Sequence, residues 1–249
     1  MSDTMQAAAR YEPWDEDTTP FRPELRLEAA TYRPGCLFNL APALWSAAGE
    51  AGEYVTSQGG GFAYQNRLLP AGRPLRLYGQ NKGEVVWDGD VIIPTLIDMR
   101  RRYDTGERFV PGTPPEQRVK LGAVWMSLTP MEMMTQRGAF RLAAGTVVLG
   151  GLGLGWLLRK VAEKPEVERV VVVEKCQALL DRFGYRMCGQ FGKVSDVICA
   201  DIYNQLGKHG VGARYLLDIW HLYSGASEDD RLVPWRRKLK RRLWAWGLD

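Results

Sequence analysis

Histidine is scarce in this sequence and paired cysteine motifs are missing, and both facts limit the kinds of site it can build. Only two histidines are present, His209 and His221, which makes a histidine-rich metal site improbable and predicts no bound metal. The cysteines include no C-x-x-C pair, so we expect free thiols in a reducing cytoplasm. The four cysteines are Cys36, Cys176, Cys188 and Cys199.

Long apolar runs are also missing. The longest uncharged apolar stretch covers residues 145–158, which is shorter than the ~20 residues of a membrane-spanning helix. The first residues carry acids and no apolar segment of the kind found in signal peptides. The sequence therefore predicts neither a transmembrane helix nor a secretory leader.

The charge is modest and unevenly placed. The formal net charge is +4, yet residues 235–244 alone hold six basic side chains, and without them the charge would be −2. The basic character thus belongs to one segment and is not a general property of the surface.

Composition divides the chain into four parts. Residues 1–24 are polar and proline-containing, and we expect a flexible arm. Residues 25–118 hold short β-prone runs separated by turn signals such as QNKG and DGD, which predict hairpins in a small β-rich domain. An α/β domain is expected at 119–234 and a basic amphipathic helix at 235–249.

The α/β prediction follows from strands that alternate with helices. Thr129, Pro130 and Glu132 provide an N-cap, a proline at the first helical position and a capping-box acid for a helix ending near Gly145. The run RVVVVEK is almost entirely β-branched, as in a parallel strand buried on both faces. Further strands are expected at 146–150, 194–202 and 213–220, with helices at 156–164 and 176–187.

A glycine-rich turn follows the first of these strands. Gly151, Gly153 and Gly155 form a G-x-G-x-G pattern, and glycine here indicates that something approaches the backbone closely. The dinucleotide fingerprint G-x-G-x-x-G would need a small residue at Trp156, which disfavours a nicotinamide oxidoreductase. No G-K-[ST] follows, so the turn is not a P-loop.

The segment VVLGGLGLG resembles motif I of the class I, Rossmann-like S-adenosylmethionine (SAM) methyltransferases, and most closely the spermidine-synthase-like branch. The resemblance covers about residues 126–223. It implies a Rossmann-like doubly wound sheet with SAM as the cofactor. Because SAM carries no phosphate, the turn needs only close approach and free N–H groups.

The resemblance also implies roles for acids at the strand ends. Glu174 corresponds to the acid that accepts both ribose hydroxyls, and Asp201 to the acceptor of the adenine amino group. Ile202 would cover the adenine ring. Asp218 corresponds to the fourth-strand motif and would face the transferable methyl, with His221 as a candidate general base.

Other motifs of the superfamily are missing. No N/D-P-P-Y/F follows the fourth strand, which argues against an amino-methylating DNA enzyme, and the aminopropyltransferase pattern D-[SA]-x-D is missing as well. Only residues 219–249 follow Asp218, which is too few for the three further strands of a full methyltransferase sheet. We therefore expect a truncated sheet that ends after its fourth strand.

Two classes of function remain open on this reading. The first is a SAM-dependent methyltransferase of unknown substrate, and the second is a non-catalytic SAM-fold binding or assembly module. The glycine turn could also be a tight βα turn that binds nothing. Asp201 and Asp218 could be helix N-caps, and His221 a core residue.

The basic tail has two interpretations. Its apolar residues Trp235, Leu239, Leu243 and Trp246 recur at helical spacing, so a helix could simply pack on the truncated sheet. Alternatively, its basic face could bind an anionic partner such as nucleic acid or a membrane surface. A homo-oligomer, in which a second copy replaces the missing strands, is also left open.

Overall fold

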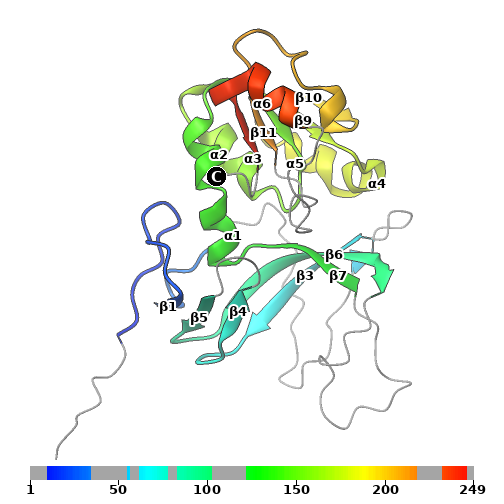
Figure 1. Ribbon diagram of the computed structural model, residues 1–249. Helices are drawn as coiled ribbons and strands as arrows, with labels where there is room; N and C mark the ends of the chain where they lie inside the picture. Colours follow the sequence, from blue (N-terminus) through cyan, green and yellow to red (C-terminus); the bar gives the residue numbers. More distant parts are fainter. Residues whose placement is uncertain are drawn as a thin grey trace, which may run out of the picture.

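The computed structural model describes residues 10–34, 55–56, 62–77, 83–102, 122–217 and 232–245. In Figure 1, strands of the N-terminal half form the lower part of the molecule, and a parallel sheet flanked by helices forms the upper part.

Two small sheets make up the described N-terminal half. One is antiparallel, with the strand order β2-β3-β6-β7, and the other has the order β1-β5-β4, in which β1 runs parallel to β5. The strands are β1 (Glu24–Leu27), β2 (Val55–Thr56), β3 (Phe62–Leu69), β4 (Leu75–Leu77), β5 (Gly83–Trp87), β6 (Val91–Arg102) and β7 (Gly122–Ser127).

Of the two hairpins that the turn signals predicted, one is observed. β4 and β5, which flank the QNKG signal, pair antiparallel as predicted. The DGD signal joins β5 to β6, which belong to different sheets, so the predicted hairpin there is wrong. Asp88 and Asp90 instead accept hydrogen bonds from the backbone N–H groups of Ala29 and Ala71. β7 lies beyond the boundary expected at residue 118, yet it pairs with β6 and extends the antiparallel sheet.

The C-terminal half is α/β, as predicted, with five parallel strands in the order β10-β9-β8-β11-β12. β8 comes first in the sequence among the strands of this sheet and lies at its centre. The chain then adds β9 and β10 on one side of β8 before it crosses to the other side. The strands are β8 (Gly145–Gly150), β9 (Val167–Glu174), β10 (Val194–Cys199), β11 (Arg214–Leu217) and β12 (Leu243–Ala245).

Both faces of the central strands β8 and β9 are buried over most of their length, which explains their valine-rich sequences. Val147 and Leu149 of β8 belong to a core that also contains Leu25 and Trp87 of the N-terminal strands. Val148 and Val171 point to the other face and pack with Leu239. A strand covered on both faces needs apolar residues at every position, as the sequence indicated.

The connecting helices lie where they were predicted, but the first is divided at Gln136 and the last contains a π-helix. Thr129 is the N-cap expected, and its hydroxyl accepts the N–H of Glu132 at 3.3 Å. The Glu132 carboxylate binds Ser127 and does not complete a capping box with Thr129. The helices are α1 (Pro130–Thr135), α2 (Arg137–Leu142), α3 (Trp156–Glu163), α4 (Gln177–Leu179), α5 (Tyr185–Cys188) and α6 (Val233–Leu239), with a π-helix at Leu180–Gly184 between α4 and α5.

Two predictions about the C-terminus are wrong. The helix expected over 235–249 ends at Leu239 and is followed by a 3₁₀-helix, Lys240–Arg242. The sheet does not stop at its fourth strand, because β12 pairs in parallel with β11 and adds a fifth. The physical reason is that β11 would otherwise leave a row of unpaired backbone groups at the sheet edge.

The expected flexible arm is also corrected for its described part, residues 10–24. Trp14 is buried beside Tyr32, with a distance of 6.4 Å between the ring centroids. Lys160 on α3 binds the carboxylates of Glu16 and Asp17 at 2.7 and 3.2 Å. This segment is therefore part of the packed structure.

Candidate functional site

The glycine turn connects β8 to α3 at the carboxyl end of the central strand. Gly151, Gly153 and Gly155 have φ angles of 90°, 50° and 73°, a region that side chains with a Cβ rarely adopt. Gly155 is also the N-cap residue of α3. The backbone conformation of the turn is therefore by itself a sufficient reason for glycine at these three positions.

The predicted close approach to the backbone of the turn is also observed, but the atoms that approach it belong to other side chains of the protein. A Cβ at Gly150 would lie 2.6 Å from Cγ1 of Ile202, and a Cβ at Gly153 would collide with the Met126 sulfur. Met126 comes from β7, in the N-terminal antiparallel sheet. Its side chain therefore fills the concave side of the turn at Gly153.

The backbone N–H groups of the turn have acceptors within the chain. Leu152 donates to Oε2 of Glu174 at 3.0 Å, and Leu154 donates to the Met126 sulfur at 3.2 Å. Gly151 donates to the carbonyl of Val173 at 2.8 Å. A ligand that needs Leu152 or Leu154 as a donor must replace Glu174 or Met126.

Glu174 ends β9 and lies against the turn. Its two carboxylate oxygens accept the N–H groups of Leu152, at 3.0 Å, and of Cys176, at 2.8 Å. Burial raises the pKa of this carboxyl, and the backbone hydrogen bonds partly oppose that shift. A carboxylate has about four acceptor positions, so Glu174 keeps capacity for a further donor.

Asp201 and Ile202 follow β10 at the same edge of the sheet. Asp201 caps the 3₁₀-helix Ile202–Asn204 by accepting the N–H of Tyr203 at 3.1 Å, which is the capping role left open by the sequence. Its other oxygen lies 3.3 Å from Nζ of Lys175. Ile202 is buried against Gly150 and the sheet.

The structure thus brings the glycine turn, Glu174, Asp201 and Ile202 to one edge of the sheet. The candidate catalytic residues Asp218 and His221 lie outside the described residues, although Asp218 directly follows the last residue of β11. Sequence reasoning missed Met126 and Lys175. Lys175 could have been found from its position next to Glu174 at a strand end, whereas no local signal marks Met126.

Trp156 occupies the position where a dinucleotide fingerprint needs a small residue. It begins α3 and is 1% exposed, so the indole fills the space between the helix and its neighbours. Its indole N–H has no hydrogen-bond partner among the described residues. A buried tryptophan stands where the dinucleotide fingerprint needs a small residue for close packing of helix on strand.

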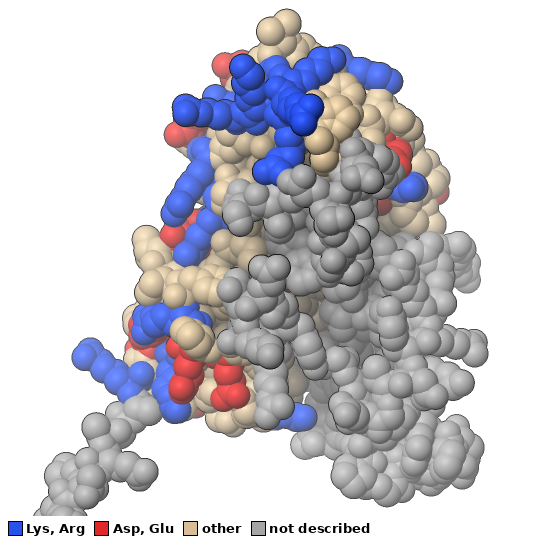
Figure 2. Space-filling view, viewed as in Figure 1, with Lys and Arg blue, Asp and Glu red and all other residues tan. Residues whose placement is uncertain are grey.

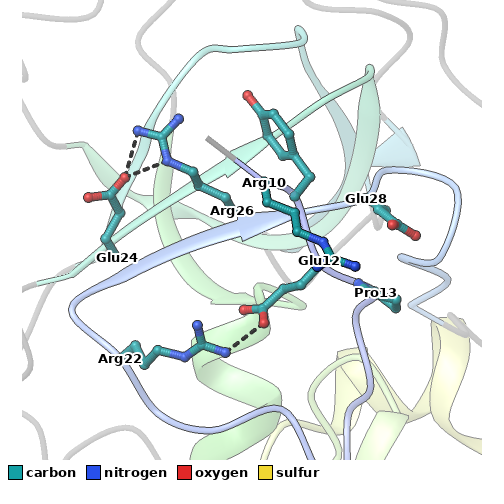
Figure 3. A pocket seen from close by; sticks show the side chains of 8 residues that line it. Arg10, Glu12, Pro13, Arg22, Glu24, Arg26 and Glu28 are labelled. Carbon is teal, nitrogen blue, oxygen red and sulfur yellow. Dashed lines mark hydrogen bonds and ion pairs between the residues drawn. The ribbon is translucent and has the colours of Figure 1, made fainter. Parts of the chain in front are cut away.

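A hollow of about 700 Å³ lies elsewhere, among residues 10–28 (Figure 3). Arg22 pairs with Glu12 at 2.6 Å and Arg26 with Glu24 at 2.8 Å, so most of its charges are neutralised within the hollow. None of its lining residues belongs to the parallel sheet or the glycine turn. They are Arg10, Tyr11, Glu12, Pro13, Arg22, Glu24, Arg26 and Glu28.

The part of the chain that the structure describes lacks a metal-ligand cluster, a disulfide and a membrane-spanning helix. No group of three or more metal-ligating side chains is found there, and Cys176, Cys188 and Cys199 are free thiols. No helix in the same residues has the length and apolar character needed to cross a bilayer.

Comparison of the chain with protein families, curated proteins and solved structures gives no match.

Proposed function

We propose that this chain is a SAM-dependent methyltransferase that binds its cofactor at the carboxyl edge of the parallel sheet. The observation that carries the proposal is the contact between Glu174 and Leu152. It joins the acid at the end of β9 to the glycine turn at the end of β8. In the family that the sequence resembles, these two features hold the ribose and the methionine part of SAM.

The strand order supports a Rossmann-like, doubly wound fold. In chain order the five strands lie 3-2-1-4-5, which is the order of the first five strands of a doubly wound nucleotide-binding sheet. The strand order reverses between β8 and β11, and ligands of open α/β sheets bind at the carboxyl ends of strands beside such a switch point. The glycine turn follows β8 at this place.

The residue types fit SAM once one side chain moves. Glu174 would accept ribose hydroxyls, Asp201 would accept the adenine amino group and Ile202 would lie against the ring. Met126 now fills the turn at Gly153, so the methionine part of the ligand requires this flexible side chain to leave. When bound, SAM supplies a methyl group already activated by its sulfonium.

The protein's contribution to methyl transfer is mainly positioning. Holding the acceptor in line with the methyl accounts for much of the rate increase in such reactions. Asp218, which follows β11, would accept a proton from the acceptor or orient it, and His221 is the alternative base.

A titration of the purified protein with SAM tests the binding part of the proposal. Hydrogen bonds to a charged acceptor are worth roughly 1.5–3 kcal/mol, so Glu174→Ala should weaken SAM binding at least ~10-fold. Glu168→Ala is the matched control, because Glu168 is an exposed acid in the same strand. Equal affinity in the two variants, or tighter binding of NADH than of SAM, would remove the assignment.

The second candidate is a non-catalytic module, and one observation favours it. The N–H groups of Leu152 and Leu154 already have acceptors in the chain, as in a turn whose role is structural. Transfer of labelled methyl from SAM to fractionated lysate separates the two candidates. The enzyme requires labelling that falls by about 10²-fold or more in Asp218→Asn. A protein that binds SAM tightly and labels no fraction is the module.

A further inference from the structure

A cluster of cations lies on α6 and the 3₁₀-helix that follows it. We call this surface the basic ridge. Residues 232–245 contain no acid, and Figure 2 shows the blue side chains gathered over this end of the molecule. The ridge consists of Arg236, Arg237, Lys238, Lys240, Arg241 and Arg242.

Five of these six cations face solvent, and three of them have no internal partner among the described residues. Every residue of the ridge except Arg242 is exposed. Among the described residues, Arg237, Lys240 and Arg241 form no ion pair or side-chain hydrogen bond. By contrast, Arg22, Arg26 and Arg169 each pair with a carboxylate.

The backbone of the basic ridge is fixed to the parallel sheet. β12 continues directly from it and pairs with β11, and the Arg242 guanidinium donates to the carbonyl of Val211. Trp235 packs against Gly207, and the Lys238 ammonium lies 4.8 Å from the centre of the Trp235 ring. The backbone that carries these cations is therefore already ordered, which lowers the entropic cost of binding a partner.

The buried side of the segment favours nucleic acid over a membrane. Leu239 of α6 is only 3% exposed, because it packs against the sheet, and Trp244 of β12 is 5% exposed within the sheet. An amphipathic membrane helix needs its apolar face free to enter the bilayer. Here Leu239 on that face is already buried, and five of the six cations of the ridge are exposed.

We propose that the basic ridge binds the phosphate backbone of nucleic acid. Four of its six cations are arginines, whose planar guanidinium groups bind phosphate oxygens in pairs. Contacts of this kind do not read sequence, and their strength falls steeply with salt. The inference does not depend on the proposed SAM site, since none of the residues assigned to that site belongs to the ridge.

Fluorescence anisotropy with a labelled oligonucleotide of mixed sequence, as a single strand and as a duplex, tests this proposal over a range of KCl concentrations. The ridge variant is Arg237→Gln with Arg241→Gln. The control is Arg73→Gln with Arg186→Gln, two exposed arginines on other elements that remove the same charge. We expect the ridge variant to bind about 10-fold or more weakly and to reduce the salt slope by about 2, while the control changes little.

Three results would overturn the proposal. The first is that the wild-type protein binds neither oligonucleotide at low salt. The second is that the control variant weakens binding as much as the ridge variant does. The third is binding to vesicles containing anionic lipid without binding to nucleic acid, which would make the partner a membrane. SAM titration of the ridge variant separates the two proposals, because its SAM affinity should equal that of the wild type.

Discussion

At the residue scale, Met126 and Glu174 control access to the glycine turn. Each accepts one backbone N–H of the turn, from Leu154 and Leu152 respectively, and each comes from a different strand. A thioether is a weak acceptor on a flexible side chain, whereas a carboxylate is a strong one. Met126 is therefore the contact that a ligand can replace at the lower cost.

Replacement of Met126 by alanine should empty the concave side of the turn. Met131→Ala is the matched control, since both methionines are 7% exposed and both variants should lose about 2–5 kcal/mol of unfolding free energy. Only Met126→Ala should bind SAM several-fold more tightly than the wild type, as measured by calorimetry. Equal SAM affinity in the two variants would mean that Met126 does not compete with the cofactor.

The stability contribution of Glu174 should depend on pH. Its folded-state pKa is raised by burial above the ordinary value of 4.5. In the window from 4.5 up to the raised pKa, the folded protein keeps a proton that the unfolded chain has released, so the unfolding free energy falls as pH rises. The stabilisation that comes from the raised pKa of Glu174 is fully present below the pKa of the unfolded chain. It is lost as the pH rises through the pKa of the folded protein.

Glu174→Gln isolates this effect, because glutamine does not titrate. Both carboxylate oxygens accept N–H groups, and glutamine has one acceptor oxygen, so the variant should also lose about 1–3 kcal/mol. Urea unfolding on both sides of the window should give a wild-type advantage that shrinks as pH rises. An advantage that grows with pH would mean that the backbone donors outweigh burial.

At the element scale, Lys240 determines where α6 ends. Among the described residues, it is the one non-glycine residue with a positive φ, at 49° with ψ at −124°. This conformation turns the chain from the helix into the 3₁₀-helix, and from there into β12. The same geometry is unfavourable for a residue with a Cβ and costs roughly 1–3 kcal/mol.

Lys240→Gly should remove this strain. After the entropic cost of glycine, we expect a net gain of about 1 kcal/mol, or ~2–4 °C in Tm. Lys240→Ala is the control, because it removes the same charge and keeps the Cβ. Thermal unfolding in which the alanine variant gains as much as the glycine variant would attribute the effect to charge.

At the scale of the whole molecule, the N-terminal segment is joined to the α/β half through polar contacts. Arg137 on α2 donates to the backbone carbonyls of Glu16 and Thr19 at 2.7 Å each, and to that of Asp15 at 3.3 Å. Lys160 adds ion pairs with Glu16 and Asp17. Burial lowers the pKa of this ammonium, but the two acids more than offset it, so the pKa is raised.

Arg137→Ala should therefore loosen residues 10–24 without unfolding the sheet. Loss of several charge-assisted hydrogen bonds should speed amide exchange of this segment about 10-fold or more, as followed by hydrogen–deuterium exchange and mass spectrometry. Arg141→Ala on the same helix is the control, since Arg141 is exposed and has no partner among the described residues. Equal protection in all three proteins would show that the remaining contacts, such as buried Trp14 and the Lys160 ion pairs, suffice to hold the segment.

Much of the parallel sheet could be predicted because its signals are local. A strand buried on both faces requires apolar side chains at consecutive positions, and β9 carries four valines in a row. A turn with positive φ at three positions requires glycine, so the β8–α3 turn was visible as well. Glu174 could be placed at the turn because parallel strands end at the same edge of a sheet.

The contacts between residues far apart in the chain were decided only by the tertiary structure. The glycine pattern predicted a close approach at the turn, but only the packing of the antiparallel sheet on the α/β half identifies Met126 as the residue that approaches Gly153. Residues 243–245 have a helical pattern, yet they form β12 because β11 offers an unpaired edge. Local sequence specifies backbone preferences and burial. The partner of a buried group is selected only when the whole chain is packed, and that selection determines which atoms of the turn remain for a ligand.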